Sequence, residues 1–256
     1  MKKHLPNAVT CLNLLCGCLA LKFIFAGELE TGAWFVAAAA LADFADGLLA
    51  RALRVSSAIG KDLDSLADMV SFGVVPGAIL FKLLTTWASS VSVAEGGVIT
   101  GDINFQMFSM SELLVHIACR WLPYFGFLVT IFSALRLAKF NNDTRQTTSF
   151  IGLPTPACTL VVASLPLILS HDRFGVHDVV LNPIVLVGLT VLLSGLLVAE
   201  LPLFALKFKS LRWGDNRRRF IFILLAAGLL LGLQAAAVPL VVLLYVLLSV
   251  PKTAAR

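Results

Sequence analysis

Long apolar stretches separated by short polar connections account for most of the chain. Eight of them can be marked, at about 8–27, 31–53, 66–88, 115–138, 152–170, 178–200, 218–233 and 235–250. Each is roughly the length that a helix needs to cross about 30 Å of hydrocarbon, although the last two are short and closely spaced. Because backbone polar groups in lipid must be satisfied within their own segment, each stretch predicts a helix. The pattern therefore predicts an all-α membrane protein, a polytopic bundle of about eight transmembrane helices, in which 218–250 forms either one span or a tight hairpin of two.

The amino-acid composition supports this class. The chain is 59% hydrophobic and 14% charged, whereas a soluble domain is about 45–50% apolar and about 25% charged. One core of this size could not bury the excess, so the bilayer must take it. We see no internal repeat or low-complexity linker, and we expect one membrane-embedded domain over 1–256. The cysteines lack disulfide or metal spacing, and no cleavage site follows the first apolar stretch, which we expect to remain as a span.

The placement of positive charge predicts the orientation and matters more than the net charge of +5. In the eight-span arrangement, 16 of the 20 Lys and Arg residues fall on one side of the membrane. The positive-inside rule puts that side, and with it both termini, in the cytoplasm. The basic run 207–219 has interleaved apolar residues, which favours contact with anionic lipid heads over nucleic acid. The segment 89–113 has no Lys or Arg, and we expect a translocated loop whose role stays open.

Four aspartates interrupt the apolar pattern. Asp43 and Asp46 lie three residues apart in the second half of the second stretch, and this spacing puts both on one helix face. Asp64 and Asp68 lie four residues apart at the start of the third stretch, again on one face. A short basic connection turns the chain between the two stretches, so their helices run antiparallel. We therefore expect both carboxylate pairs to converge near the cytoplasmic boundary.

Four carboxylates at this depth predict a metal site. A single charged side chain at the centre of a span costs roughly 2.5–3.5 kcal/mol on insertion scales, and like charges repel. Hard oxygen ligands without His or Cys suit Mg²⁺, Mn²⁺ or Ca²⁺, and two metals would fit four carboxylates and one diphosphate. Two other readings stay open from the residues alone. The aspartates would then cap helix ends, or they would line an ion pathway in a transporter.

The spacing around these aspartates resembles a family signature. The pattern Asp43-x2-Asp46-Gly47-x2-Ala50-Arg51-x8-Gly60-x3-Asp64-x3-Asp68 matches that of the CDP-alcohol phosphotransferase family at every fixed position. The rest of the chain is consistent with that family's six-helix catalytic core over about 1–200 and two further helices over about 218–250. The segments LDSLADMVSFGVVPG, LPNAVTCLNLLCG, RLAKFN and FIGLPTPA are similar to bacterial integral-membrane members that use L-serine. Lys139 stands where many members have Arg.

The resemblance implies a transferase of phospholipid biosynthesis. We expect transfer of the phosphatidyl group from CDP-diacylglycerol to L-serine, with release of CMP, in the cytoplasmic membrane of a prokaryote and with the active site facing the cytoplasm. Asp43, Asp46, Asp64 and Asp68 would hold two Mg²⁺ or Mn²⁺ ions, and Asp68 would also be the general base. The family implies a homodimer. Two alternatives stay open: the same chemistry with another acceptor, such as glycerol 3-phosphate or inositol phosphate, or an ion-coupled transporter.

The resemblance also predicts substrate contacts. Those to CDP-diacylglycerol are expected from Asn7, Thr10, Gly47, Ala50, Arg51, Ser57 and Gly60. Asn7 and Thr10 could instead cap the first helix. Arg136 and Lys139 are expected to bind the serine carboxylate, although both would equally serve as positive anchors at the membrane boundary. Weaker candidates are Asn13, Ser71 and Asn141.

Overall fold

A computed structural model describes residues 4–55, 57–94, 110–142, 150–203 and 213–249. The segment 95–109 and residues 207–212 of the basic run lie outside the described residues, so the predictions about the loop and the basic run stay untested. The first part of the chain forms three long helical runs: α1 (His4–Phe25), α2 (Leu29–Leu53), and a continuous run of α3 (Ala58–Asp68), the π-helix η1 (Met69–Val74) and α4 (Val75–Ala94).

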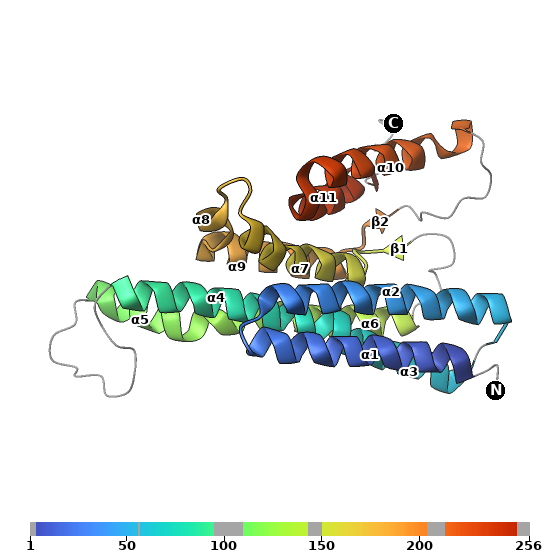
Figure 1. Cartoon of the computed structure of the whole chain (residues 1–256), viewed down its shortest axis with the longest axis horizontal. Coiled ribbons are helices and arrows are strands. Elements are labelled where there is room, and N and C mark those ends of the chain that lie inside the picture. The colour runs from blue at the N-terminus through green and yellow to red at the C-terminus, as the bar shows by residue number, and fades with distance from the viewer. Residues whose placement is uncertain (1–3, 56, 95–109, 143–149, 204–212, 250–256) are drawn as a thin grey trace.

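The second part is also helical, apart from one pair of two-residue strands. Its elements are α5 (Met110–Trp121), the 3₁₀-helix η2 (Leu122–Phe127), α6 (Leu128–Asn142), β1 (Phe150–Ile151), α7 (Thr155–His171), α8 (His177–Val180), α9 (Pro183–Val198), β2 (Pro202–Leu203), α10 (Trp213–Leu233), the 3₁₀-helix η3 (Gln234–Ala236) and α11 (Ala237–Ser249). Helices α1 to α6 form one long layer, α7 to α9 lie against it, and α10 and α11 lie beyond them (Figure 1).

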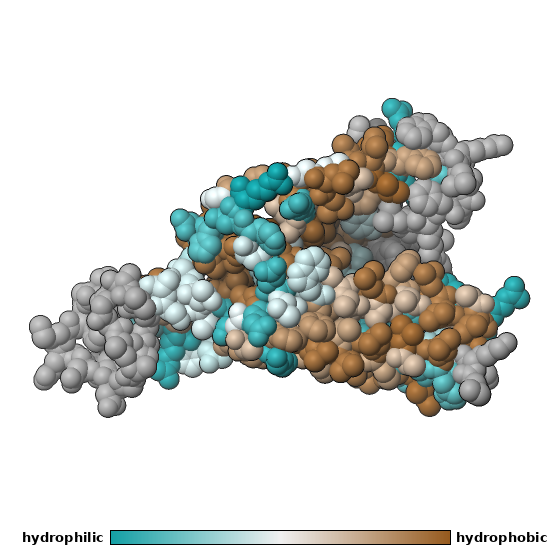
Figure 2. All heavy atoms as spheres, viewed as in Figure 1, coloured by the Kyte–Doolittle hydropathy of each residue, from teal (hydrophilic) through white to brown (hydrophobic). Residues whose placement is uncertain are grey.

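Helix length and surface composition show a polytopic helical membrane protein, as predicted. Five described helical runs are long and apolar enough to cross a membrane, and α7 and α9 are shorter apolar helices. Many large hydrophobic side chains lie on the outside instead of in a core, among them Leu41, Ile184 and Leu231. Figure 2 shows hydrophobic surface spread over α1, α2 and the α10–α11 pair. A surface of this kind needs lipid rather than water around it.

Several predicted boundaries were wrong by three to eight residues. The third helical run begins at Ala58 instead of 66, because Ser57 caps α3 by accepting a hydrogen bond from the backbone N–H of Gly60 at 3.0 Å. Helix α7 begins at Thr155 instead of 152, since the preceding residues pair with Pro202–Leu203. Helix α9 begins at Pro183 instead of 178, after the separate short helix α8. Apolar composition alone does not reveal these caps and pairings.

The final apolar segment forms a hairpin of two helices. Gln234 takes a left-handed backbone conformation (φ 51°), which breaks the helix between α10 and α11. The two helices pack against each other, and the ring centroids of Phe222 and Tyr245 lie 5.6 Å apart. The tight hairpin is thus the arrangement that the structure adopts.

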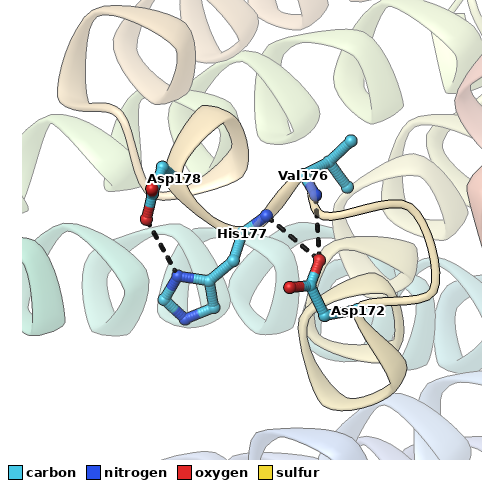
Figure 3. A network of polar contacts seen from close by, with 4 residues as sticks. All are labelled: Asp172, Val176, His177 and Asp178. Carbon is cyan, nitrogen blue, oxygen red and sulfur yellow. Dashed lines mark hydrogen bonds and ion pairs between the residues drawn. The ribbon is translucent and has the colours of Figure 1, made fainter.

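The turn after α7 is built from local hydrogen bonds (Figure 3). Asp172 Oδ1 accepts from the backbone N–H groups of Val176 at 2.9 Å and His177 at 3.2 Å. Asp178 Oδ1 lies 3.4 Å from Nδ1 of His177. The two hydrogen bonds to Asp172 satisfy backbone N–H groups at the start of α8 that have no partner within the helix. The chain then reverses direction and continues as α9.

The π-helix η1 is the point where α3 becomes α4, and neighbouring threonines support it. Thr159 Oγ1 of α7 donates to the carbonyl oxygen of Phe72 at 2.9 Å, and Thr130 Oγ1 of α6 donates to that of Gly73, also at 2.9 Å. A π-helix disturbs the regular ladder of backbone hydrogen bonds, and such segments are frequent at functional sites. The two threonine hydrogen bonds link η1 to α7 and α6, immediately after Asp68 in the chain.

Candidate metal and nucleotide site

The aspartates of α2 and α3 converge as predicted. The two helices run antiparallel and both pack against α1 (Figure 1). One carboxylate oxygen from each of Asp43, Asp64 and Asp68 lies within 4.8 Å of the others, and all three residues are half-buried. We call these three residues the aspartate cluster. The register of the two helices and their packing against α1 bring these side chains together.

Asp46 belongs to the same site but faces a different neighbour. Its side chain is only 7% exposed, and its Oδ2 accepts a hydrogen bond from Thr10 Oγ1 of α1 at 2.7 Å. The charge of Asp46 is near enough to interact with that of Asp64. Asp46 therefore lies beside the aspartate cluster, on the side toward α1. Thr10 could have served only to cap the first helix, but its hydroxyl binds Asp46.

Asn13 was a weak candidate in the sequence, and in the structure it contacts the aspartate cluster. Its Nδ2 donates to Asp68 Oδ1 at 3.4 Å, and its side chain is fully buried. Ser71 Oγ donates to the backbone carbonyl of Asn13 at 3.1 Å, which ties α1 to η1 at this level. Within the part of the chain that the structure describes, the Oδ1 atom of Asn13 has no hydrogen-bond partner. The only sequence signal was a polar residue inside an apolar stretch.

A cavity of about 220 Å³ opens beside the aspartate cluster. Its walls come from the start of α1, the end of α2 and the start of α3. The lining residues are Pro6, Asn7, Thr10, Asp46, Gly47, Ala50, Val55, Ser57, Gly60, Lys61 and Asp64. Six of the seven residues predicted to bind the nucleotide are among them. The seventh, Arg51, is exposed next to this wall and donates from Nε to the carbonyl oxygen of Gly47 at 2.9 Å. Lys61 is a cavity residue that the sequence analysis did not select.

Two glycines shape this cavity in different ways. A Cβ atom on Gly60 would lie 2.9 Å from both Asn7 Oδ1 and Ser57 Oγ, so α1 and α3 approach closely only because the side chain is absent. A Cβ atom on Gly47 would meet nothing nearer than the Arg51 guanidinium, at 3.8 Å. A side chain at position 60 would therefore force Asn7 or Ser57 to move, whereas the space beside Gly47 is open.

The two predicted serine ligands lie in different environments. Arg136 of α6 is 7% exposed, whereas Lys139 is exposed near the end of the same helix. Hydrogen bonds between α6 and the third run set the depth of Arg136. Asn141 Nδ2 donates to Ser65 Oγ at 2.9 Å, and Thr130 binds the carbonyl of Gly73. Arg136 lies between these two contacts and therefore at about the level of Asp68. Asn141, a weaker candidate, is engaged with α3.

A family comparison agrees with this arrangement. The sequence model of the CDP-alcohol phosphatidyltransferase family matches residues 3–195, which include every aspartate of the site. The chain belongs to this family. The match ends before α10, so the C-terminal hairpin lies outside the part that the CDP-alcohol phosphatidyltransferases share.

Individual relatives carry one common name, CDP-diacylglycerol–serine O-phosphatidyltransferase. A protein of Helicobacter pylori (strain J99 / ATCC 700824) with this name is 28% identical over 228 residues, which cover 88% of this chain and 80% of the relative. One of Bacillus subtilis (strain 168) is 28% identical over 190 residues, covering 71% and 88%. One of Saccharomyces cerevisiae (strain ATCC 204508 / S288c) is 30% identical over 202 residues, covering 72% and 64%.

The donor set fits the divalent metal on which a CDP-alcohol phosphatidyltransferase depends. The aspartate cluster offers only hard carboxylate oxygens, close enough together to share an ion. The side chains that donate to Asp46 and Asp68, Thr10 and Asn13, are both neutral. Half-buried carboxylates at such short separations repel, and a divalent cation is the partner that would relieve the repulsion.

Proposed function

We propose that this protein transfers the phosphatidyl group of CDP-diacylglycerol to the hydroxyl of L-serine, producing phosphatidylserine and CMP. The observation that carries the proposal is the aspartate cluster at the wall of a cavity that also holds Asn7, Thr10, Gly47, Ala50, Ser57 and Gly60. This arrangement suits a diphosphate beside a metal centre with a nucleotide in the cavity. The common name of the relatives supports serine as the acceptor.

The proposal includes a metal centre held by Asp43, Asp46, Asp64 and Asp68, with two Mg²⁺ or Mn²⁺ ions. When bound, these ions neutralise the charge of the diphosphate and of the departing CMP. The chain's own part is to present the carboxylates at the right depth. Thr10 holds Asp46, and Asn13 holds Asp68, each through the hydrogen bond described above. Such supporting contacts fix the orientation of ligands that would otherwise repel one another.

We propose that Asp68 is the general base. Its carboxylate accepts the proton of the serine hydroxyl, and the serine oxygen forms a bond to the phosphorus that carries diacylglycerol. The bond between that phosphorus and the bridging oxygen of the diphosphate breaks, and CMP leaves with the electron pair. A carboxylate near cations is a weak base, so alignment of the hydroxyl must supply much of the rate. The buried amide of Asn13 supports this alignment by holding Asp68 Oδ1.

Arg136 is the proposed ligand of the serine carboxylate. A buried ionisable residue in a membrane helix is a functional-site candidate by default, because its burial is costly. The guanidinium matches a carboxylate in a two-pronged hydrogen-bonded pair, and its helix register places it at about the level of Asp68. Lys139, exposed one turn further along α6, is proposed as a second cation that attracts the acceptor.

We further propose that the site faces the cytoplasm, in the cytoplasmic membrane of a prokaryote. The cavity walls include the start of α1 and the two ends of α2 and α3 that are joined by a short connection. Arg51, Arg54 and Lys61 lie in or next to this connection, and positive charge of this kind favours the cytoplasmic side. The catalytic core would cover about 1–200, with the hairpin of about 218–250 added to it. The resemblance to the family adds a homodimer, which the mass of the purified protein in detergent would test.

The proposed reaction is tested by CMP release from purified protein with CDP-diacylglycerol, Mn²⁺ or Mg²⁺, and one acceptor at a time. The acceptors are L-serine, glycerol 3-phosphate and inositol phosphate. CMP release that requires both metal and L-serine, with phosphatidylserine as the lipid product, is the expected result. Release with another acceptor alone would overturn the serine assignment. Absence of release with all three would favour the ion-coupled transporter.

A further inference from the structure

A proline in the third helical run deprives one backbone carbonyl of its usual partner. In a regular α-helix the carbonyl oxygen of Phe72 would accept from the backbone N–H of residue 76, but Pro76 has no N–H group. The backbone N–H of Val75 donates to the carbonyl oxygen of Val70, five residues earlier, so the run is π-helical here. Prolines in membrane-spanning helices are tolerated where a side chain such as that of threonine binds the freed carbonyl.

Thr159 of α7 supplies such a donor from another part of the chain. Its Oγ1 donates at 2.9 Å to the carbonyl oxygen of Phe72, which is 87 residues away in sequence. The same hydroxyl is shared with the carbonyl oxygen of Thr155, in its own helix, at 3.0 Å. The Thr159 side chain is fully buried, so solvent cannot replace the hydroxyl. Its removal would therefore take a donor from a buried carbonyl, which is unfavourable.

Phe72 connects this contact with the helices of the aspartate site. It lies four residues after Asp68 in the same helical run, and its side chain packs with Cys16 of α1 and Ala39 of α2 in a small buried cluster. Ala39 precedes Asp43 by one turn of α2. Phe72 thus contacts both of the other helices that form the site, while its backbone is bound to α7.

A second set of contacts connects η1 with the Asp68 carboxylate. Ser71, next to Phe72, donates from Oγ to the carbonyl oxygen of Asn13 at 3.1 Å, and Asn13 Nδ2 donates to Asp68 Oδ1 at 3.4 Å. A Cβ atom on Gly17 would collide with Ser71 Oγ, so α1 and η1 are in close contact at this level. A shift of η1 would therefore move Asn13, and with it the amide that holds Asp68.

We propose that Thr159 is a positioning residue for Asp68, acting through the Phe72 carbonyl and η1 rather than by contact with substrate or metal. This inference rests on the proposed function, because it takes Asp68 as a metal ligand and as the general base. Thr159 lies apart from the nucleotide cavity, whose lining residues come from α1, α2, α3 and the connection between α2 and α3. Helix α7 thereby contributes to the orientation of a site that it does not line.

The test compares Thr159→Val with the wild-type protein in detergent, since Val keeps the branched shape of the side chain and lacks the hydroxyl. We expect kcat for CMP release at saturating Mn²⁺ to fall about ten-fold, the lower end of the effect of removing a group that supports a metal ligand. The KM for L-serine should stay within two-fold. The Kd for Mn²⁺, measured by electron paramagnetic resonance, should rise about ten-fold. Thr159→Ser retains the hydroxyl and should restore both values to within two-fold of the wild type.

Thr190→Val is the matched control. Thr190 is also a fully buried helical threonine, but its Oγ1 donates at 2.7 Å to the carbonyl oxygen of Leu186 in the same helix, α9. Both valine variants should lower the melting temperature by a similar amount, because each loses one buried hydroxyl. Only Thr159→Val should lower kcat and weaken Mn²⁺ binding.

Unchanged kcat and Mn²⁺ affinity in Thr159→Val would overturn the inference. Equal losses in Thr190→Val would also overturn it, since they would indicate a general loosening of the bundle. If Thr159→Val does not fold, Thr159→Ala, which also lacks the hydroxyl, takes its place under the same criteria. Absence of CMP release by the wild-type protein with L-serine would overturn the proposed function, whereas the Mn²⁺ titrations of the same variants would still decide whether Thr159 positions Asp68.

Discussion

Helices α3 and α4 belong to one continuous helical run and yet have opposite characters. Helix α3 buries only Ala67 and carries Asp62, Asp64 and Asp68. Helix α4 lies in the centre of the bundle, where Ile79, Leu80, Leu83 and Leu84 are each at most 1% exposed. The π-helix η1 separates the two. The comparison shows how a membrane enzyme can place costly carboxylates on a helix without weakening its packing, since the packing is concentrated beyond the π-helix.

Metal removal should have the largest effect on CMP release, because it acts on the aspartates that α3 carries. Without a divalent cation, the aspartate cluster cannot hold the diphosphate, and EDTA is expected to abolish CMP release. Mn²⁺ or Mg²⁺ added in excess should restore it. Because α4 supplies the packing, the protein should remain folded in EDTA, as measured by circular dichroism in detergent. Full activity after exhaustive chelation would contradict the metal site.

Asp68→Asn should lower the rate of CMP release by roughly 10³-fold, within the range that general acid–base catalysis contributes. The amide keeps the shape of the side chain but cannot accept the serine proton. The matched control is Asp62→Asn, on the same helix but exposed and outside the aspartate cluster. It should stay within two-fold of the wild type. More than a tenth of the wild-type rate in Asp68→Asn would remove Asp68 as the base.

Leu80→Ala tests whether the packing of α4 stabilises the fold. Truncation of this fully buried side chain should lower the free energy of unfolding by about 2–5 kcal/mol, because a cavity remains where Leu80 packed. The activity of the folded fraction at low temperature should stay near that of the wild type. Thermal unfolding in detergent measures the first effect and CMP release the second. Leu231→Ala, on the exposed face of α10, is the control and should change stability by under about 0.5 kcal/mol.

Gly60→Ala should have the smallest effect, at the contact between α3 and α1. The added methyl group would meet Asn7 and Ser57 at 2.9 Å and separate α1 from α3 at the cavity wall. We expect the KM for CDP-diacylglycerol to rise about ten-fold, which corresponds to the lower end of the usual cost of overpacking. Gly188→Ala, with nothing within 4 Å of the new Cβ atom, is the control. Equal values for the two variants would show that the wall tolerates expansion.

Much of the fold and of the candidate site could be predicted from local spacing. Helical period alone places Asp43 with Asp46 and Asp64 with Asp68, and a reversal of the chain between the pairs brings them together. The cap at Ser57, the pairing of β1 with β2 and the break at Gln234 were harder to foresee. Each depends on backbone geometry that hydropathy does not report. The role of Asn13 was hidden for another reason, because an isolated polar residue in a span has many possible partners.

The sequence by itself determined the membrane class, the helical secondary structure, the family and the position of the aspartates. These follow from hydrophobic length and from residues that are near one another in the chain. Only the tertiary structure decided which distant side chains meet: Thr10 with Asp46, Asn13 with Asp68, and Asn141 with Ser65. Contacts between separate helices depend on how the helices pack and rotate against one another. Packing of that kind is a property of the whole bundle and cannot be read from any one segment.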